Sequence, residues 1–183
     1  MSLLTFPIGR QAPVEVNAIV EIPKGSSNKY EFDLQHEVFI LDRVLYSPLY
    51  YPCDYGWIAA TLSEDSDPLD ILILGSQPTF PGCVVESRPL GALAMRDEHG
   101  TDFKVLAVSS RDPRFHETRR LSDLNTHLLR EIEHFFRVYK DLEEKETEVA
   151  GWVDMEQTYK VIVESHQRLT GKLLPMPSLA PAG

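Results

Sequence analysis

Asp65-Ser66-Asp67-Pro68-Leu69-Asp70 runs directly into Ile71-Leu72-Ile73-Leu74, so three carboxylates stand at the entrance of an apolar segment. Ser66 and Pro68 favour a turn, and the apolar run that follows is typical of a buried strand. Carboxylates this close repel one another unless a cation or a proton is shared among them. A turn anchored by a strand can direct three carboxylates to one point, which is how Mg²⁺ is held. The alternative interpretation is an exposed, solvated acidic loop.

The bulk composition indicates one globular domain. The 183 residues suffice for a full core, and 43% hydrophobic with 25% charged residues is ordinary for a soluble protein. The net charge of -10 argues against nucleic-acid binding, although bound cations would still allow a phosphate substrate. Cys53 and Cys83 are expected to be free thiols. Since we see neither a signal peptide nor a membrane-spanning run, we expect a cytoplasmic location and no membrane partner.

The first two thirds of the chain predict short strands separated by turns. Apolar residues alternate over 14–22, and a loop is expected over 23–27. Lys29 and Glu31 alternate with aromatic residues, which places both charged side chains on one face of a strand. Further strands are expected at 38–44, 71–74, 83–87 and 103–108, with turns at Pro81-Gly82 and His99-Gly100.

The last third of the chain changes to helical periodicity. Apolar residues from Leu124 to Leu142 recur at steps of three and four, which predicts a helix with Ser122 as its N-cap. A second helix should begin after Asp154, with Gln157 placed for a capping-box contact, and end at Gly171. We therefore expect one β-rich α+β domain over residues 1–174, with two helices packed outside a small barrel or compact sheet. Residues 175–183 are proline-rich and predict a loosely held tail.

A second acidic segment, residues 97–104, contains Asp102 and Lys104, which share a face of an expected strand because they are two positions apart. On its own, this pair is best interpreted as a surface ion pair that contributes little to stability. Lys29 and Glu31 repeat the arrangement on another strand. The two strands and the aspartate turn together would then form a cavity with carboxylates on one wall and cations on the other.

Arg43, the tyrosines and Lys140 are less specific signals. Arg43 follows an apolar segment and either pairs locally or supplies the forked donors that phosphate oxygens prefer. The aromatic-rich stretch 50–57 is typical of core, although a tyrosine hydroxyl that reaches a cavity donates well to an oxyanion. Tyr139 lies on the apolar stripe of the expected helix, and Lys140 beside it is placed to offset the helix dipole.

Taken together, these blocks resemble the soluble family I inorganic pyrophosphatases of the prokaryotic type. The family signature D-x-D-P-x-D is matched by residues 65–70. The other matching blocks, in the same order as in the family, are Glu21 before Ile22-Pro23, Lys29-Tyr30-Glu31, Arg43, Tyr51-Pro52-x-x-Tyr55-Gly56, Asp97-Glu98-x-Gly100-x-Asp102-x-Lys104 and Tyr139-Lys140-Asp141-Leu142-Glu143. Departures from the family pattern are Ser66 for the usual glycine, Asp54 for the common asparagine and Trp57 for the usual tyrosine, and Thr101 and Phe103 flank Asp102 where an acidic residue often precedes the lysine.

The resemblance implies a small closed OB-like barrel and Mg²⁺-dependent hydrolysis of pyrophosphate to two orthophosphates, through direct attack of a metal-activated water. It implies several Mg²⁺ ions for each site, Mn²⁺ as a possible substitute, and a homohexamer. The catalytic residues implied are Asp67, as the general base, and Glu21, which orients the cations. The metal ligands implied are Asp65, Asp70, Asp97, Asp102 and Glu31. The phosphate-binding residues implied are Lys29, Arg43, Tyr55, Lys104, Tyr139 and Lys140.

Other uses of the aspartate motif fit the sequence less well. An EF-hand beginning at Asp65 would have Asp70 at the position that requires glycine and Ser76 at the position of the last glutamate ligand. An aspartyl phosphatase requires an apolar strand before the motif, and residues 60–64 are too polar for that. A glycosyltransferase motif leaves the distributed cations and tyrosines unexplained. The remaining alternative is a non-catalytic metal- or phosphate-binding barrel related to the pyrophosphatases.

Overall fold

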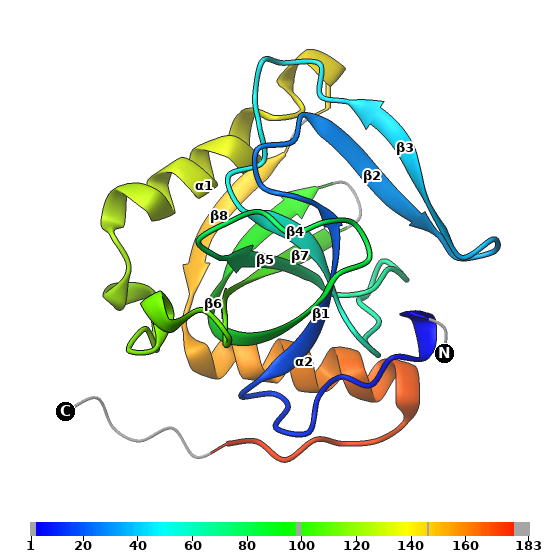
Figure 1. The fold of residues 1–183 in the computed structure, drawn as a ribbon, viewed down its shortest axis with the longest axis vertical. Coiled ribbons are helices and arrows are strands. Elements are labelled where there is room, and N and C mark those ends of the chain that lie inside the picture. The colour runs from blue at the N-terminus through cyan, green and yellow to red at the C-terminus, as the bar shows by residue number, and fades with distance from the viewer. Residues whose placement is uncertain (1–2, 98–99, 146, 178–183) are drawn as a thin grey trace.

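The computed structural model describes residues 3–97, 100–145 and 147–177. Its main sheet forms a closed ring, because β6 pairs with β7 on one side and returns to pair with β1 on the other (Figure 1). The β-rich α+β single domain with a small closed barrel is therefore confirmed. In order around the ring, the strands are β1 (Val16–Ile22), β4 (Asp54–Ile58), β5 (Asp70–Leu74), β7 (Gly100–Ser109) and β6 (Val84–Asp97); β8 (Glu148–Val153) extends the sheet beside β6.

The parallel pairing of β5 with β7 sets the position of the acidic residues. Ile71 pairs with Val105, so Asp70 and Lys104, one position earlier in each strand, lie at the same edge of the barrel. Both faces of these strands are buried, which explains the continuous apolar run over 71–74. Leu72 packs in a cluster with residues of the first helix, whereas Ile71 packs in a second cluster with residues of the last helix.

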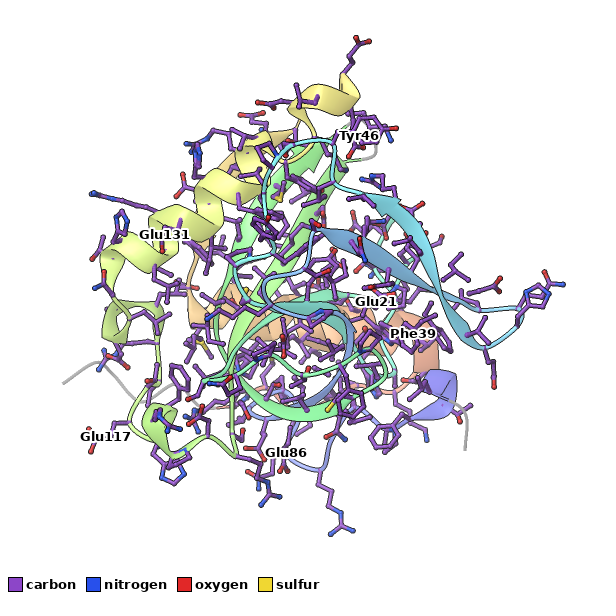
Figure 2. The ribbon with its side chains drawn as sticks, turned by 45° about the horizontal axis from the view of Figure 1, so that its top comes forward. Glu21, Phe39, Tyr46, Glu86, Glu117 and Glu131 are labelled. Carbon is purple, nitrogen blue, oxygen red and sulfur yellow. The ribbon has the colours of Figure 1, made fainter. Side chains whose placement is uncertain are left out.

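A separate two-stranded sheet stands beside the barrel (Figure 1). It is made by β2 (Asn28–Asp33) and β3 (Val38–Val44). Phe32 and Phe39 from the two strands contact Trp57 of the barrel, with ring centroids 5.5 and 6.3 Å apart, and Figure 2 shows Phe39 at this junction. Because an isolated two-stranded sheet is only marginally stable, these aromatic contacts hold the hairpin in place.

Helix α1 (Thr126–Val138) begins later than the sequence predicted. Asn125, not Ser122, is its N-cap, and its side chain accepts a hydrogen bond from the backbone of His127. Ser122 lies in a separate 3-10 turn, which ends where Leu124 adopts an extended conformation. The expected continuation to Leu142 is also wrong, because the helix ends at Val138 with Tyr139 as its C-cap, and Leu142 belongs to the 3-10 turn η4 (Asp141–Glu143).

Helix α2 (Met155–Thr170) has the predicted bounds. The carboxylate of Asp154 accepts a hydrogen bond from Gln157 N at 3.0 Å, and Gly171 ends the helix in the left-handed conformation, with φ of 70°. The predicted apolar face is buried against the barrel, as Ile162 shows with no exposed surface. In the described ranges, no helix is both long and apolar enough to cross a membrane.

The sequence did not predict β4 or β8, and it predicted only parts of β6 and β7. Strand β4 lacks alternation because it is buried on both faces and contains Gly56. A Cβ at Gly56 would lie 1.9 Å from the carbonyl oxygen of Ile19, so the close approach of β1 requires glycine there. The first strand begins at Val16, and Val14 lies in the preceding turn. The expected turn at His99 falls outside the described residues, as does most of the predicted tail; the domain limit at 174 stays a prediction.

Candidate active site

The acidic loop, residues 59–69, joins β4 to β5 and forms the predicted turn. Thr61 closes its base, because its hydroxyl donates to Ile58 O at 2.6 Å and accepts from Leu69 N at 3.0 Å. Inside the loop, Asp67 N donates to the Asp65 carboxylate at 3.0 Å. The loop is therefore internally hydrogen-bonded as well as acidic.

A buried ion cluster lies next to the acidic loop. Lys104 is only 3% exposed, and its Nζ lies 2.5 Å from Asp70 and 2.8 Å from Asp102. Tyr55 donates its hydroxyl proton to the same carboxylate oxygen of Asp70 at 2.6 Å. The Lys104 ammonium also lies 5.5 Å from the ring centroids of Tyr55 and Phe136. The pair Asp102–Lys104 is therefore part of a buried cluster, so its interpretation as a surface ion pair is wrong.

Burial and mutual attraction shift the pKa values in this cluster in opposite ways. Burial alone lowers the pKa of Lys104, but the charges of Asp70, Tyr55 and Asp102 raise it well above its ordinary value. Burial raises the pKa of Asp70, an effect that Lys104 opposes. Burial also raises the pKa of Tyr55 well above its ordinary value. Lys104 is thus held as a cation and Tyr55 as a neutral donor.

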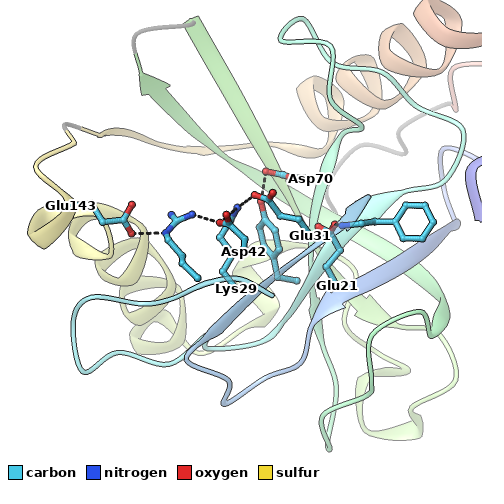
Figure 3. Close-up of polar contacts among 9 residues, drawn as sticks. Glu21, Lys29, Glu31, Asp42, Asp70 and Glu143 are labelled. Carbon is cyan, nitrogen blue, oxygen red and sulfur yellow. Dashed lines mark hydrogen bonds and ion pairs between the residues drawn. The ribbon is translucent and has the colours of Figure 1, made fainter. Parts of the chain in front are cut away.

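The β2–β3 hairpin contributes a row of alternating charges (Figure 3). Arg43 Nε donates to Glu143 at 2.9 Å and its other end contacts Asp42; Lys29 lies 3.3 Å from Asp42 and contacts Glu31 on the same face of β2. Lys29 pairs with Arg43 across the two strands, which brings the two cations together. Sequence reasoning assigned no role to Asp42 or to Glu143, although Asp42 precedes Arg43 directly and Glu143 ends the last matching block.

The carboxylates of the acidic loop, the hairpin and β7 are close enough to influence one another. Burial raises the pKa of Asp67, and the charges of Asp65, Glu31 and Asp102 raise it further. Within the described ranges, no three metal-ligating side chains are already gathered as a cation site. The set is nevertheless made of carboxylate oxygens, which are the ligands Mg²⁺ and Ca²⁺ prefer, and a divalent cation would relieve their mutual repulsion.

The comparisons with known proteins agree with this arrangement. A model of the family described as inorganic pyrophosphatase matches residues 18–170. The chain belongs to the inorganic pyrophosphatase family.

The inorganic pyrophosphatase of Halalkalibacterium halodurans is 51% identical over 87% of this chain and 98% of its own length. That of Geobacillus stearothermophilus is 52% identical over 81% of this chain and 90% of its own length. The crystal structure of the enzyme from Thermus thermophilus superposes with a TM-score of 0.90 at 41% identity, covering 93% of this chain and all of that chain. The predicted family is therefore confirmed, and with it the class of inorganic diphosphatase.

Three of the departures from the family pattern have structural consequences. Ser66 has a φ of 74°, a left-handed conformation that favours glycine, so serine is strained there. Asp54 is buried, and its carboxylate accepts hydrogen bonds from Lys24 N at 2.7 Å and from the Thr79 hydroxyl at 2.7 Å. Trp57 belongs to the aromatic cluster that anchors the hairpin. Asp54 and Trp57 therefore hold loops around the pyrophosphatase barrel together.

The remaining predicted residues, apart from Asp97, lie outside the Asp70–Lys104–Asp102 cluster and the charged row of the hairpin. Tyr139 is buried and stacks on Phe135 with ring centroids 5.4 Å apart, and Lys140 lies 5.3 Å from the Tyr139 ring. The Tyr51 ring is buried, as expected for the aromatic stretch. Asp97 ends β6, but its side chain lies outside the described part of the structure.

Glu21 gives the metal-free protein a pH dependence. Its carboxylate accepts a hydrogen bond from Phe32 N at 3.0 Å (Figure 3). Burial, reinforced by Asp70 and Glu31, raises its pKa to about 8. Because the pKa is higher in the folded than in the unfolded chain, Glu21 stabilises the fold at low pH. That stability is lost as the pH rises through about 8.

We therefore expect the free energy of unfolding of Glu21→Gln, measured by urea denaturation in a chelator, to vary less between about pH 5 and about pH 9 than that of the parent. Glu117→Gln is the matched control, because Glu117 is exposed and lies at the edge of the molecule, away from Glu21 (Figure 2). If the free energy of unfolding changes equally with pH in the parent and in Glu21→Gln, Glu21 is not the source of the pH dependence.

Proposed function

We propose that this protein hydrolyses pyrophosphate to two orthophosphates with Mg²⁺ as its cofactor. The observation that carries the proposal is the buried Asp70–Lys104–Asp102 cluster beside a loop of three aspartates. It combines carboxylates for divalent cations with cations for phosphate oxygens. A barrel that only bound a metal would not require the cations, and one that only bound phosphate would not require the carboxylates.

In this proposal Mg²⁺ is held by Asp65, Asp70, Asp97, Asp102 and Glu31. Bound there, Mg²⁺ neutralises phosphate oxygens and lowers the pKa of a water molecule. Asp70 would bind the cation from the buried end of the loop, where hydrogen bonds from Tyr55 and Lys104 fix the orientation of its carboxylate. Glu21 takes no direct ligand position. Its carboxylate accepts a hydrogen bond from Phe32 N, next to Glu31 in β2, and from that position it orients the cations.

Asp67 acts as the general base. Burial and the surrounding carboxylates raise its pKa in the metal-free protein, and bound cations would lower that pKa, so the two effects together would leave a base poised to accept a proton. Its place in the acidic loop, two residues from Asp65, keeps it next to the proposed ligands. The attacking water gives its proton to the Asp67 carboxylate as the oxygen bonds to phosphorus and the bridging oxygen leaves.

Cations and neutral hydroxyls bind the phosphate oxygens. Arg43 and Lys29 form ion pairs with Asp42, Glu143 and Glu31, which keep both side chains in one row. Pyrophosphate oxygens can replace these partners without reorganising the hairpin, so the donors are preorganised. The full phosphate-binding set that we propose is Lys29, Arg43, Tyr55, Lys104, Tyr139 and Lys140.

We further propose that the chain works as a homo-oligomer, with a homohexamer as the expected form, and that it is cytoplasmic. The two cysteines support a reducing compartment, since both are free and burial raises the pKa of Cys53 to about 12, which keeps that thiol protonated.

The direct test is phosphate release from pyrophosphate with each divalent cation alone. We expect turnover with Mg²⁺ and lower but clear turnover with Mn²⁺, which has a similar size and coordination. Ca²⁺ should bind the carboxylates without supporting turnover, because it is larger and acidifies water less, and should compete with Mg²⁺. Absence of phosphate release with Mg²⁺ would favour the non-catalytic barrel, and equal rates with Ca²⁺ and Mg²⁺ would contradict the proposed water activation.

A further inference from the structure

The end of α2 is hydrogen-bonded to the first half of the acidic loop. Leu62 N donates to Ser165 O at 3.0 Å, and Arg168 Nη1 donates to Leu62 O at 2.8 Å. The Nδ1 of His166 lies 2.8 Å from Ala60 O. A carbonyl oxygen only accepts, so Nδ1 of His166 carries the proton. The backbone of Ala60 and Leu62 is therefore hydrogen-bonded to three nearby residues of one helix.

These contacts hold a backbone conformation that is unfavourable in isolation. Ala60 has a φ of 53°, in the left-handed region that residues other than glycine rarely adopt. Such a conformation persists only where the surroundings fix it. His166 is buried and binds the carbonyl of Ala60 itself. Helix α2 therefore stabilises the loop at the point where its backbone is strained.

A cavity of about 300 Å³ lies between the acidic loop, the start of β7 and α2. Its lining includes Asp65, Asp102 and Arg168, and the guanidinium of Arg168 lies 3.6 Å from Glu64. Where the cavity lies, the acidic loop is not packed against side chains of β7 and α2. The position of Asp65 therefore depends on the polar contacts at the edges of the cavity.

We propose that His166 and Arg168 are positioning residues, which hold the acidic loop so that Asp65 is placed to bind a cation and Asp67 stays beside it. This inference rests on the proposed function, since it assigns the loop to cation binding. Neither side chain reaches the carboxylates of Asp65 or Asp67 in the contacts of the structure, and both act through the backbone of residues 60 and 62. Their removal should weaken cation affinity more than it weakens the fold.

Two substitutions test the proposal. His166→Phe keeps the ring volume and removes the donor, and Arg168→Met keeps most of the apolar chain and removes the guanidinium. We expect each to weaken Mn²⁺ binding, measured by calorimetry without substrate, by about tenfold, as is typical for residues that orient metal ligands. In the assay, the Mg²⁺ concentration for half-maximal rate should rise by a similar factor, while kcat at saturating Mg²⁺ recovers most of its value.

Two control variants separate positioning from general damage. His166→Asn places an amide N–H near the position of Nδ1 and should restore the parent affinity. Gln167→Ala changes an exposed neighbour on the same turn and should bind Mn²⁺ as the parent does. If His166→Phe does not fold, Arg168→Met decides the question alone, because its side chain is 35% exposed.

Lower melting temperatures with unchanged Mn²⁺ affinity would overturn the proposal and leave the two residues with a purely structural role. A parent protein that binds Mn²⁺ but does not hydrolyse pyrophosphate would contradict the proposed function instead. The Mn²⁺ affinities of the His166 and Arg168 variants would still test the positioning role.

Discussion

Asp67→Asn is expected to lower kcat for pyrophosphate hydrolysis by about 10²–10⁴-fold, the usual contribution of a general base, while Mn²⁺ affinity changes little. The amide keeps the size of the carboxylate but removes its negative charge, and with it the capacity to accept a proton from water. The raised pKa of Asp67 depends on burial and on its acidic neighbours, all of which the variant retains. Steady-state rates at saturating Mg²⁺, together with calorimetric titration of Mn²⁺, measure the two effects separately.

Asp70→Asn is the contrasting variant, and it should lose both turnover and cation affinity. Its carboxylate is bound by Lys104 and Tyr55 and is proposed as a metal ligand, so neutralisation removes a ligand as well as a charge. Glu131→Gln, on the exposed side of α1 (Figure 2), is the matched control for the loss of one negative charge. Equal losses of Mn²⁺ affinity in Asp67→Asn and Asp70→Asn would show that the general base is assigned wrongly.

Lys104→Met should have the largest effect on the stability of the metal-free protein. Methionine fills the space of the lysine chain, but Asp70 and Asp102 lose the cation that lies 2.5 and 2.8 Å away. Breaking a buried pair by removing one partner costs about 3–5 kcal/mol, and we expect about 2–4 kcal/mol here because water partly reaches both carboxylates. Urea denaturation in a chelator measures this loss.

Mg²⁺ should recover part of the stability lost in Lys104→Met, because a divalent cation restores positive charge between the carboxylates. Turnover should stay at least about 100-fold below the parent, since a cation that we propose to bind phosphate is missing. Lys160→Met is the matched control, because that lysine is exposed and its carboxylate partner lies 4.0 Å away. If Lys104→Met and Lys160→Met unfold at the same urea concentration, the buried pair does not have the importance we assign to it.

The fold could be predicted from the sequence wherever one face of an element is buried. The alternation in β1 and the spacing along α2 each reflect burial of a single face, and both elements lie close to where they were expected. Strand β4 is buried on both faces, and the register of β8 with β6 shifts next to Gly151, so neither strand has a distinctive period. Ser122 was mistaken for an N-cap because the 3-10 turn before α1 has the same local composition as a helix start.

The sequence predicted which residues belong to the candidate site, but it did not predict which of them contact one another. The alternation in β2 correctly put Lys29 and Glu31 on one face. Burial of Lys104 between two carboxylates could not be derived locally, because it depends on the parallel register of two strands. The contacts of Arg43 with Glu143 and of His166 with Ala60 join residues 100 and 106 positions apart. No pattern within one segment contains such information.

The parallel register of β5 and β7 also constrains the order in which the chain can fold. Residues 71 and 105 pair directly, and the long strand β6 lies between them in sequence, so the chain must close a large loop before Lys104 can meet Asp70. Loop closure of this kind is entropically slow compared with the formation of helices and hairpins. The β2–β3 hairpin, which carries Lys29 and Arg43, pairs locally, but its aromatic contacts with Trp57 also require the barrel. During refolding, the proposed site is therefore complete only after the barrel closes, and activity returns no sooner than that.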